Sequence, residues 1–313
     1  MNPSSSHGLH PIPEISPKEF SKIIDDLPHL LPELMETRIG ILGDICIDSY
    51  IYGSVTRINP EAPVPVVVYE REESRLGMGA NVAVNVAAFG ARCWLFGICG
   101  DDPDADRLSH MLAGEPNIEN GLVRSPESPT ITKTRILAGT QHVVRLDREI
   151  IRAATASARE SVLAQVEKAL DAFDVLVLQE HAKGLFGPEL SKALHEMLRR
   201  RNMPFYIDPN TYTPARLYHG AELMTPNLSE LLNFCSIQSR SEYDLIEVAR
   251  AFKRDMELEN LIVTLGKNGM ALFEGDQVVT IPSFAREVFE VSGAGDTVMA
   301  FLAMGRAAGL DLT

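Results

Sequence analysis

Short apolar segments that alternate with amphipathic helical stretches constrain this chain more than any other feature. The helical stretches are residues 161–173 and 188–201, and Pro188 suits a first helical turn. A strand that is apolar on both faces must be covered on both faces, so the pattern predicts an α/β fold with a mostly parallel central sheet between two helical layers. The predicted strands are residues 39–42, 93–98, 175–178, 204–207, 222–224 and 261–263.

Composition and charge narrow the classes of partner. The chain has 313 residues, 45% of them hydrophobic, which is enough for one large core or two unequal ones. With 29 basic and 43 acidic residues, the net charge of -14 argues against nucleic acid or an anionic membrane as the main partner. Any phosphate-binding site must therefore be a local feature.

The sequence lacks the patterns of a membrane protein, a secreted protein and a cysteine-based metal or disulfide site. No run is as long as the roughly 18 apolar residues of a membrane-spanning helix, and the first forty residues lack a signal-peptide pattern. We therefore expect a cytoplasmic protein. The cysteines show no Cys-x-x-Cys spacing, which argues against a zinc site and against a disulfide framework. They are Cys46, Cys93, Cys99 and Cys235.

The chain divides into two parts of unequal size. Residues 1–37 form an N-terminal extension that is rich in Ser, Pro and His before a short helical pattern, and it carries no assigned chemistry. Whether it is a docking arm or a simple extension stays open. Residues 38–313 contain the α/β pattern and form the main domain.

Two segments of the main domain do not fit the central sheet. Residues 49–70 and 130–147 contain β-branched and aromatic residues around turn-rich centres. They predict a small antiparallel sheet that projects from the main domain. Such a sheet can serve as a lid that excludes water, as a dimerisation surface, or as both. In a dimer, we expect Tyr50, Tyr52, Val66 and Val68 among the buried residues.

Polar residues follow almost every predicted strand. In an open parallel sheet, ligands bind at the carboxyl ends of the strands. A single polar residue after a strand is often only a turn former or a helix cap, and we expect that of some of these. Together they predict a ligand site on one rim of the sheet. They are Asp44, Asp101, Glu180, Asp208, Asn227 and Thr264.

The segment 291–297, with Gly293-Ala294-Gly295-Asp296 at its centre, combines glycines with a carboxylate at the start of an apolar helical pattern. Glycines let backbone N–H groups approach an anion, and a helix N-terminus favours negative charge. Asp296 stands where it can take a proton from an attacking hydroxyl. Many such runs are ordinary helix starts, so the motif needs the rim residues beside it to indicate phosphoryl transfer.

Motifs in a fixed order across residues 38–313 resemble those of the ribokinase-like (PfkB) carbohydrate kinases. Among these enzymes, the chain is most similar to bacterial kinases of D-glycero-β-D-manno-heptose 7-phosphate, through residues 54–66, 133–135 and 145–147. The family motifs are Gly43-Asp44, residues 77–83, Asp208-Pro209-Asn210, residues 225–230, residues 264–269 and Gly293-Ala294-Gly295-Asp296.

The resemblance implies a ribokinase-like fold and a reaction. ATP with Mg²⁺ would phosphorylate the anomeric hydroxyl of the heptose 7-phosphate to the 1,7-bisphosphate, for ADP-heptose and lipopolysaccharide core synthesis. A requirement for a monovalent cation stays open. The alternatives are a kinase of the same fold for another sugar or a nucleoside, and a sugar-phosphate sensor without turnover.

The resemblance also implies residue roles. Asp296 would be the general base, and the backbone around Gly293, Ala294 and Gly295 would stabilise the transferred phosphoryl group. Glu230 would organise the magnesium ion through water. The implied sugar contacts are Asp44, Gly77, Gly79, Asn81 and Asp208, and the implied sugar-phosphate contacts are Arg135, Arg145 and Lys183. The implied nucleotide contacts are Asn227, Glu230, Thr264, Gly266 and Gly269.

Structural alternatives accompany several of these roles. Asn81 can equally cap the helix that follows it, and Glu230 can close a capping box with Asn227. The three cations can be solvated surface charges. His142 and His181 have no partner pattern and are interpreted as structural.

Two departures from the family pattern stand out. Heptose kinases read Asp-Tyr-x-Lys-Gly where this chain has Glu180-His181-Ala182-Lys183-Gly184, which puts the identity of the sugar phosphate in question. The family also continues beyond the helix that follows Asp296, whereas this sequence stops at Thr313. We therefore expect either that the C-terminal end of the fold is missing or that the nucleotide site is open.

Overall fold

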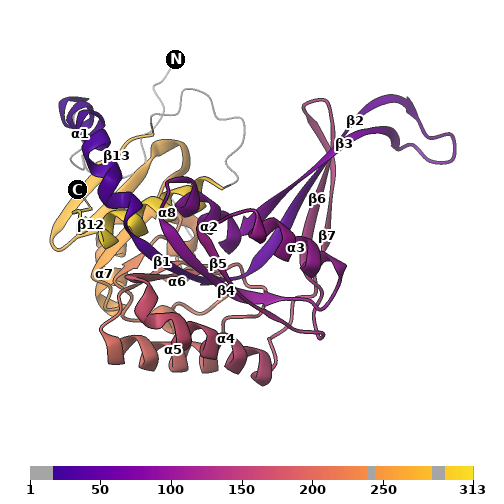
Figure 1. The fold of residues 1–313 in the computed structure, drawn as a ribbon. Helices are drawn as coiled ribbons and strands as arrows, with labels where there is room; N and C mark the ends of the chain where they lie inside the picture. The colour runs from indigo at the N-terminus through magenta and orange to yellow at the C-terminus, as the bar shows by residue number, and fades with distance from the viewer. Residues whose placement is uncertain (1–16, 238–243, 284–292, 313) are drawn as a thin grey trace, which may run out of the picture.

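The computed structural model describes residues 17–237, 244–283 and 293–312. A nine-stranded sheet in the order β13-β12-β11-β10-β9-β8-β1-β4-β5 forms the body, and a four-stranded sheet in the order β3-β2-β6-β7 projects from it (Figure 1). This arrangement confirms the predicted large sheet with a smaller projecting one.

The central sheet is parallel from β11 to β5 and antiparallel at its β12–β13 edge. All predicted strands are present, but β5, β12 and β13 were not predicted. The edge strand β5 mixes apolar and polar residues without a regular pattern. The strands are β1 (Arg38–Gly43), β4 (Arg92–Cys99), β5 (Ile118–Arg124), β8 (Val175–Gln179), β9 (Phe205–Asp208), β10 (Leu223–Met224), β11 (Asn260–Thr264), β12 (Met270–Glu274) and β13 (Gln277–Ile281).

Helices cover both faces of this sheet, as the apolar strands require. In β1, Ile39 and Ile41 pack on one face and Leu42 packs on the other, so the sheet separates two cores. The first face carries α1 (Pro17–Met35), α2 (Gly79–Ala88), α3 (Pro103–Ala113) and α8 (Ala294–Ala307) (Figure 1). The second carries α4 (Ala156–Ala169), α5 (Pro188–Arg201), α6 (Leu228–Phe234) and α7 (Leu245–Asp255).

The projecting sheet consists of two hairpins, β2 (Ile45–Ile58) with β3 (Pro65–Met78), and β6 (Ile131–Ala138) with β7 (Gln141–Arg148). We call these strands the lid. The prediction of a wholly antiparallel sheet is wrong at its centre, because β2 pairs with β6 in parallel. Both hairpins leave the main sheet from its carboxyl edge, β2 after β1 and β6 after β5, so their first strands run outward in the same direction (Figure 1).

The described part of the N-terminal extension is α1. Its Leu34 is 3% exposed and packs in the core on the first face, so the end of this helix belongs to the fold. Residues 1–16 lie outside the described residues. Across the described ranges, no helix combines the length and apolarity needed to span a bilayer.

Candidate active site

The carboxyl ends of the parallel strands form a polar rim whose order follows the sheet. Asp44 follows β1, Gln179 ends β8, Asp208 ends β9, Asn227 follows β10 and Thr264 ends β11. Two of the predicted rim residues have partners outside the rim. Asp101 is exposed and lies 3.7 Å from Arg124, and Glu180 is buried with an oxygen that accepts from the Tyr218 hydroxyl at 2.7 Å.

Asp296 is held above the middle of this rim by the start of α8. Gly293 precedes the helix with φ of 84°, and a Cβ there would lie 3.0 Å from Asn81 Nδ2, so both backbone and space favour glycine. Asp296 lies in the first helical turn, where N–H groups have no acceptor within the helix. Val291 and Ser292 of the motif lie outside the described residues.

Amide groups hold both oxygens of the Asp296 carboxylate. Asn81 Nδ2 donates to Oδ2 at 2.7 Å, and Gln179 Nε2 donates to Oδ1 at 3.0 Å. Asn81 lies inside α2, whose N-cap is Met78, so the structure does not use it as a cap. Burial raises the pKa of Asp296, the Asn81 donor lowers it, and the charge of Asp48 raises it further. The group is therefore a stronger base than an exposed carboxylate.

Asp208 is the second carboxylate at the centre of the rim. Gln179 Nε2 donates to its Oδ2 at 2.6 Å, and the Thr225 hydroxyl donates to its Oδ1 at 3.3 Å. Burial, with the charges of Asp296 and Glu230, raises the pKa of Asp208 to about 7, and the Gln179 donor opposes that rise. Asp208 therefore holds a proton to a higher pH than an exposed carboxyl group does.

The sequence prediction missed Gln179. It ended the strand at Leu178 and took Glu180 as the polar residue of the rim, whereas β8 ends at Gln179, which is 1% exposed. The usable signal was a polar residue at the last position of an otherwise apolar strand. Gln179 connects Asp208 and Asp296, which the sequence places far apart.

The β1 end of the rim is organised around Asp44. Its Oδ2 accepts backbone N–H groups from His181 and Lys183, each at 3.0 Å, so residues 180–184 wrap around this carboxylate. Burial raises the pKa of Asp44 to about 6, an effect that the two backbone donors oppose. Gly77 and Gly79 lie where β3 passes into α2, and the Gly79 N–H donates to the Asp44 carbonyl at 3.0 Å.

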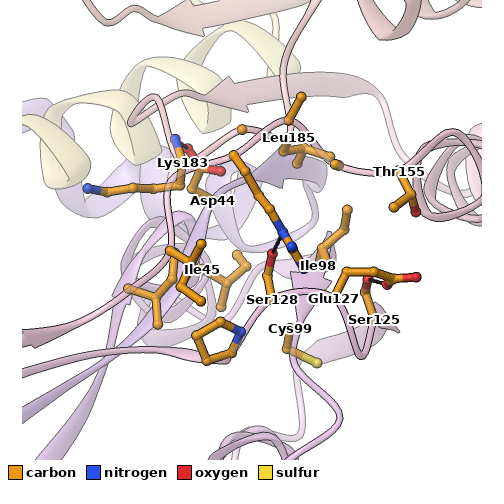
Figure 2. Close-up of a pocket in the computed structure, with 17 residues that line it drawn as sticks. Asp44, Ile45, Ile98, Cys99, Ser125, Glu127, Ser128, Thr155, Lys183 and Leu185 are labelled. Atoms are coloured by element: carbon orange, nitrogen blue, oxygen red, sulfur yellow. Dashed lines mark hydrogen bonds between the residues drawn. The ribbon is translucent and has the colours of Figure 1, made fainter.

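A small pocket of about 50 Å³ opens beside Asp44. Figure 2 shows Asp44 and Lys183 on one side of it, with Ser125, Glu127 and Ser128 on the other. Arg152 also lines the pocket, and its Nε donates to the Ser128 hydroxyl at 3.1 Å. The pocket therefore carries charged and hydroxyl groups of the kind that bind polyols and phosphates.

Each predicted sugar-phosphate cation has a carboxylate partner in the structure. Lys183 lies 2.9 Å from Glu149 and lines the pocket beside Asp44. Arg135 on β6 pairs with Asp48, and Arg145 on β7 lies 2.9 Å from Asp147. Arg135 and Arg145 are cross-strand neighbours in the lid.

His181 belongs to residues 180–184, the loop that follows β8. Its ring lies near Gln179, with the two side-chain nitrogens 3.5 Å apart. Burial, with the charges of Lys133 and Lys183, lowers the pKa of His181 to about 4, so the ring is neutral at physiological pH. It lines the pocket described next, a position that its interpretation as a structural residue did not anticipate.

A second pocket of about 220 Å³ lies at the β9–β11 end of the rim. Asn227 and Glu230 form the capping box that the sequence left open, with Asn227 Oδ1 accepting from Glu230 N at 3.0 Å and Glu230 Oε2 accepting from Asn227 N at 2.7 Å. Burial raises the pKa of Glu230, and Asn227 opposes the rise. Lining residues are Glu180, His181, Asp208, Pro209, Asn210, Thr225, Asn227, Glu230, Thr264, Gly295 and Val298.

This pocket fits a hydrated divalent cation. Its carboxylate, amide and hydroxyl oxygens suit magnesium, which keeps several waters and is held through few carboxylates and the substrate phosphates. Within the ranges that the structure describes, no three or more His, Cys, Asp or Glu residues are arranged to hold a metal directly. The residues therefore fit binding through water at Glu230 better than a direct cage.

The turn after β11 borders the same pocket. Thr264 forms a parallel bridge with Asn227, and residues 266–268 form a short 3₁₀ turn. Gly269 has φ of 86°, and a Cβ there would collide with the Ile281 carbonyl, so the turn requires glycine. Gly266 faces open space, which leaves its backbone accessible to a ligand.

The site thus joins a half-buried carboxylate with a raised pKa, a helix N-terminus that can face an anion, and two polar pockets along the same rim. That combination defines an enzyme site suited to phosphoryl transfer between two bound substrates.

The comparisons with known proteins agree with this class. Residues 37–313 match the model of the pfkB family carbohydrate kinases, and the chain belongs to this family. The chain is 40% identical over 285 residues to the "Bifunctional protein HldE" of Azorhizobium caulinodans, and 40% identical over 283 residues to that of Aeromonas salmonicida. Each alignment covers 90% of this chain but 59% and 58% of the relative, so the chain spans about three fifths of their length.

Solved structures show the same fold. Escherichia coli phosphofructokinase-2 in complex with substrates and products has a TM-score of 0.70 at 18% identity, covering 88% of each chain. The same enzyme in complex with fructose-6-phosphate has a TM-score of 0.69 at 18% identity, covering 88% of this chain and 89% of that one. The fold is ribokinase-like, and membership of the family implies use of ATP and a divalent metal.

Proposed function

We propose that this carbohydrate kinase phosphorylates the anomeric hydroxyl of D-glycero-β-D-manno-heptose 7-phosphate to the 1,7-bisphosphate, for ADP-heptose and lipopolysaccharide core synthesis. The observation that carries the catalytic part is Asp296, held by Asn81 and Gln179 between two polar pockets. The choice of sugar is supported by the 40% sequence identity to an HldE protein, in an alignment that covers 90% of this chain. It is also supported by the resemblance in residues 54–66, 133–135 and 145–147.

In the proposed reaction, Asp296 takes the proton of the sugar hydroxyl as its oxygen attacks the γ-phosphorus of ATP. A new P–O bond forms, the bond between the γ-phosphorus and the bridging oxygen breaks, and ADP leaves. The N–H groups at the start of α8, around Gly293, Ala294 and Gly295, face the charge of the phosphoryl group in transfer. Asp44 and Asn81 bind sugar hydroxyls, with Gly77 and Gly79 beside them.

The nucleotide occupies the β10–β11 end of the rim in this proposal. Asn227 and Thr264, which line the larger pocket, contact its phosphates and ribose together with Gly266 and Gly269 of the turn that follows β11. Magnesium bound through water at Glu230 would supply positive charge to the β- and γ-phosphates. A monovalent cation remains an open requirement.

The heptose phosphate would extend from Asp44 toward Lys183. Lys183 borders the pocket beside Asp44, and a phosphate there would compete with Glu149 for its ammonium group. Arg135 and Arg145 stay candidates from the lid, where closure would have to draw them away from Asp48 and Asp147. Asp208 completes the proposed substrate contacts through its position beside Asp296.

We also propose that two chains pair through the lid. The lid exposes apolar side chains that a single chain leaves in water, and exposed apolar patches commonly mark interfaces. They are Val55, Ile58, Val64, Val68, Tyr69, Val144 and Leu146. Of the residues expected there, Tyr50 and Tyr52 stack at 6.5 Å and carry arginines of the same chain over their rings, so Val68 is the stronger candidate.

The domain division remains part of the proposal. Residues 38–313 would form the kinase domain with lid segments 49–70 and 130–147, after an extension at 1–37. The free cysteines, of which Cys46, Cys93 and Cys99 are buried, suit the reducing cytoplasm in which we place the enzyme.

A substrate panel tests the proposed function. The protein is assayed for ATP-dependent phosphorylation of heptose 7-phosphate, fructose 6-phosphate, ribose and adenosine, and the product is identified by phosphorus NMR. We expect preferred transfer to the anomeric oxygen of the heptose phosphate. Preference for another sugar or nucleoside would replace the substrate, whereas sugar-phosphate binding without turnover would favour the sensor.

A further inference from the structure

The side chain of Gln179 bridges the two carboxylates at the centre of the rim. Its Nε2 donates to Asp208 Oδ2 at 2.6 Å and to Asp296 Oδ1 at 3.0 Å. A primary amide carries two N–H donors, and both are used here. The register of the sheet places Gln179 beside Asp208 on β9 and Gly43 on β1, and a Cβ on Gly43 would lie 2.9 Å from that of Gln179.

The orientation of this amide follows from its neighbours. If it were reversed, Oε1 would face two carboxylate oxygens and repel them. In the observed orientation, Oε1 is buried and has no hydrogen-bond partner among the described residues. An unpaired buried carbonyl costs about 1 to 3 kcal/mol. Gln179 therefore keeps its two donated hydrogen bonds although its own carbonyl oxygen stays unpaired. That pattern is typical of functional sites rather than of structural cores.

The bridge matters because two carboxylates that lie close together tend to share one proton. Like charges raise the pKa of both groups, and the pair then titrates as a unit. A base that shares a proton with its neighbour is ionised for less of the time. Donors that contact both carboxylates favour the state in which both are ionised.

We propose that Gln179 is a positioning residue for the phosphoryl-transfer reaction, which keeps Asp296 ionised and oriented by preventing it from sharing a proton with Asp208. The inference rests on the proposed function of Asp296 as the general base. Asn81 fixes the other oxygen of Asp296 and does not contact Asp208, so it cannot replace the bridge.

The surrounding charges define what else acts on this pair. The charge of Asp48 acts on Asp296 and that of Glu230 acts on Asp208, and Asp48 is itself paired with Arg135. The Nε2 of the neutral His181 ring lies 3.5 Å from Gln179 Nε2, and the charges of Lys133 and Lys183 act on that ring. The donors of Gln179 therefore oppose the charge of Asp48 on Asp296 and that of Glu230 on Asp208.

Two substitutions remove the bridge in different ways. Gln179→Leu keeps much of the volume without donors, and Gln179→Glu keeps the shape but adds a third carboxylate. We expect kcat at neutral pH to fall about tenfold in Gln179→Leu and further in Gln179→Glu, with the acidic limb of the kcat profile moved upward by about one pH unit. The KM of the sugar should change less than about threefold, because binding does not need the proton.

The matched control is Asn260→Leu, another buried amide, at the opposite end of a strand of the same sheet. It should alter stability without moving the pH profile. Gln179→Leu with wild-type kcat and an unmoved acidic limb would overturn the proposal.

A second readout does not depend on turnover. Carbon NMR of protein labelled at the aspartate carboxyl carbons follows Asp208 and Asp296 directly, with Asp208→Asn and Asp296→Asn as assignments. In Gln179→Leu, the midpoints of the pair should rise by about one unit. If the wild type phosphorylates no sugar, the proposed function fails while this titration still decides whether Gln179 controls the pair. Unchanged midpoints would refute the inference.

Discussion

The rim and the lid differ in which side chains they bury: the rim buries polar side chains, and the lid exposes apolar ones. On the rim, Asp44 is 6% exposed and Gln179 1%, and their side chains are bonded within the chain. On the lid, Leu146 is 65% exposed and Tyr69 62%, while Arg135 and Arg145 pair with carboxylates of the same sheet. A single chain therefore assembles the proposed catalytic groups, whereas the lid leaves apolar surface for which the chain provides no cover in the described residues.

Removing the proposed base on the rim should give the largest effect. Asp296→Asn keeps an acceptor for Asn81, so we expect the fold to persist while kcat falls by roughly two to four orders of magnitude. Steady-state kinetics and a circular-dichroism melting curve measure both. Turnover within about tenfold of the wild type would remove Asp296 from that role.

The raised pKa of Asp208 makes stability depend on pH in a defined direction. Its pKa is about 7 in the folded protein and near 3.8 when exposed, so between these values the folded state binds a proton that the unfolded state does not. Stability then falls as pH rises through this window, by up to about 1.4 kcal/mol per unit. Asp208→Asn binds no such proton and should show a flatter dependence.

Denaturant unfolding of both proteins at pH 5, 6, 7 and 8 measures this difference. The contribution of Asp44 is the same in both proteins and cancels in the comparison. Parallel curves for the wild type and Asp208→Asn would contradict a raised pKa at Asp208.

Charge on the lid should affect assembly rather than chemistry. Leu146→Asp and Val68→Asp place carboxylates on the exposed apolar surface, so we expect a dimer of the wild type to become a monomer in sedimentation. Sugar affinity should fall by about 1 kcal/mol if the interface supports lid closure. Ile24→Asp, on the exposed side of α1, is the control.

The experiment tests the dimer separately from the link between the interface and lid closure. A wild-type monomer at micromolar concentration would refute the dimer. A variant that becomes monomeric with unchanged sugar affinity would show instead that the lid closes without the interface.

The sequence predicted the parts of the fold that local pattern determines. The apolar strands had to be buried on both faces, and the glycine motif before Asp296 had to begin a helix. The edge strand β5 was missed because half of its residues face solvent and its pattern is therefore mixed.

The missing parts depend on contacts that sequence spacing does not encode. The parallel pairing of β2 with β6 depends on where two distant hairpins leave the main sheet. The sequence segment that contains Arg135 suggested a phosphate ligand. Its pairing with Asp48 depends on the pairing of β2 with β6, which sequence spacing does not reveal. Gln179 was overlooked because its role comes from Asp208 and Asp296 on two other elements.

The central claim is that the rim binds sugar at its β1 end and nucleotide at its β10–β11 end, with Asp296 between them. Calorimetry with the heptose phosphate and a non-hydrolysable ATP analogue tests it on Asp44→Ala and Asn227→Ala. We predict that Asp44→Ala weakens sugar binding by about 1 to 3 kcal/mol with little change for the nucleotide, and that Asn227→Ala does the reverse. Loss of nucleotide affinity in Asp44→Ala with intact sugar binding would contradict the account.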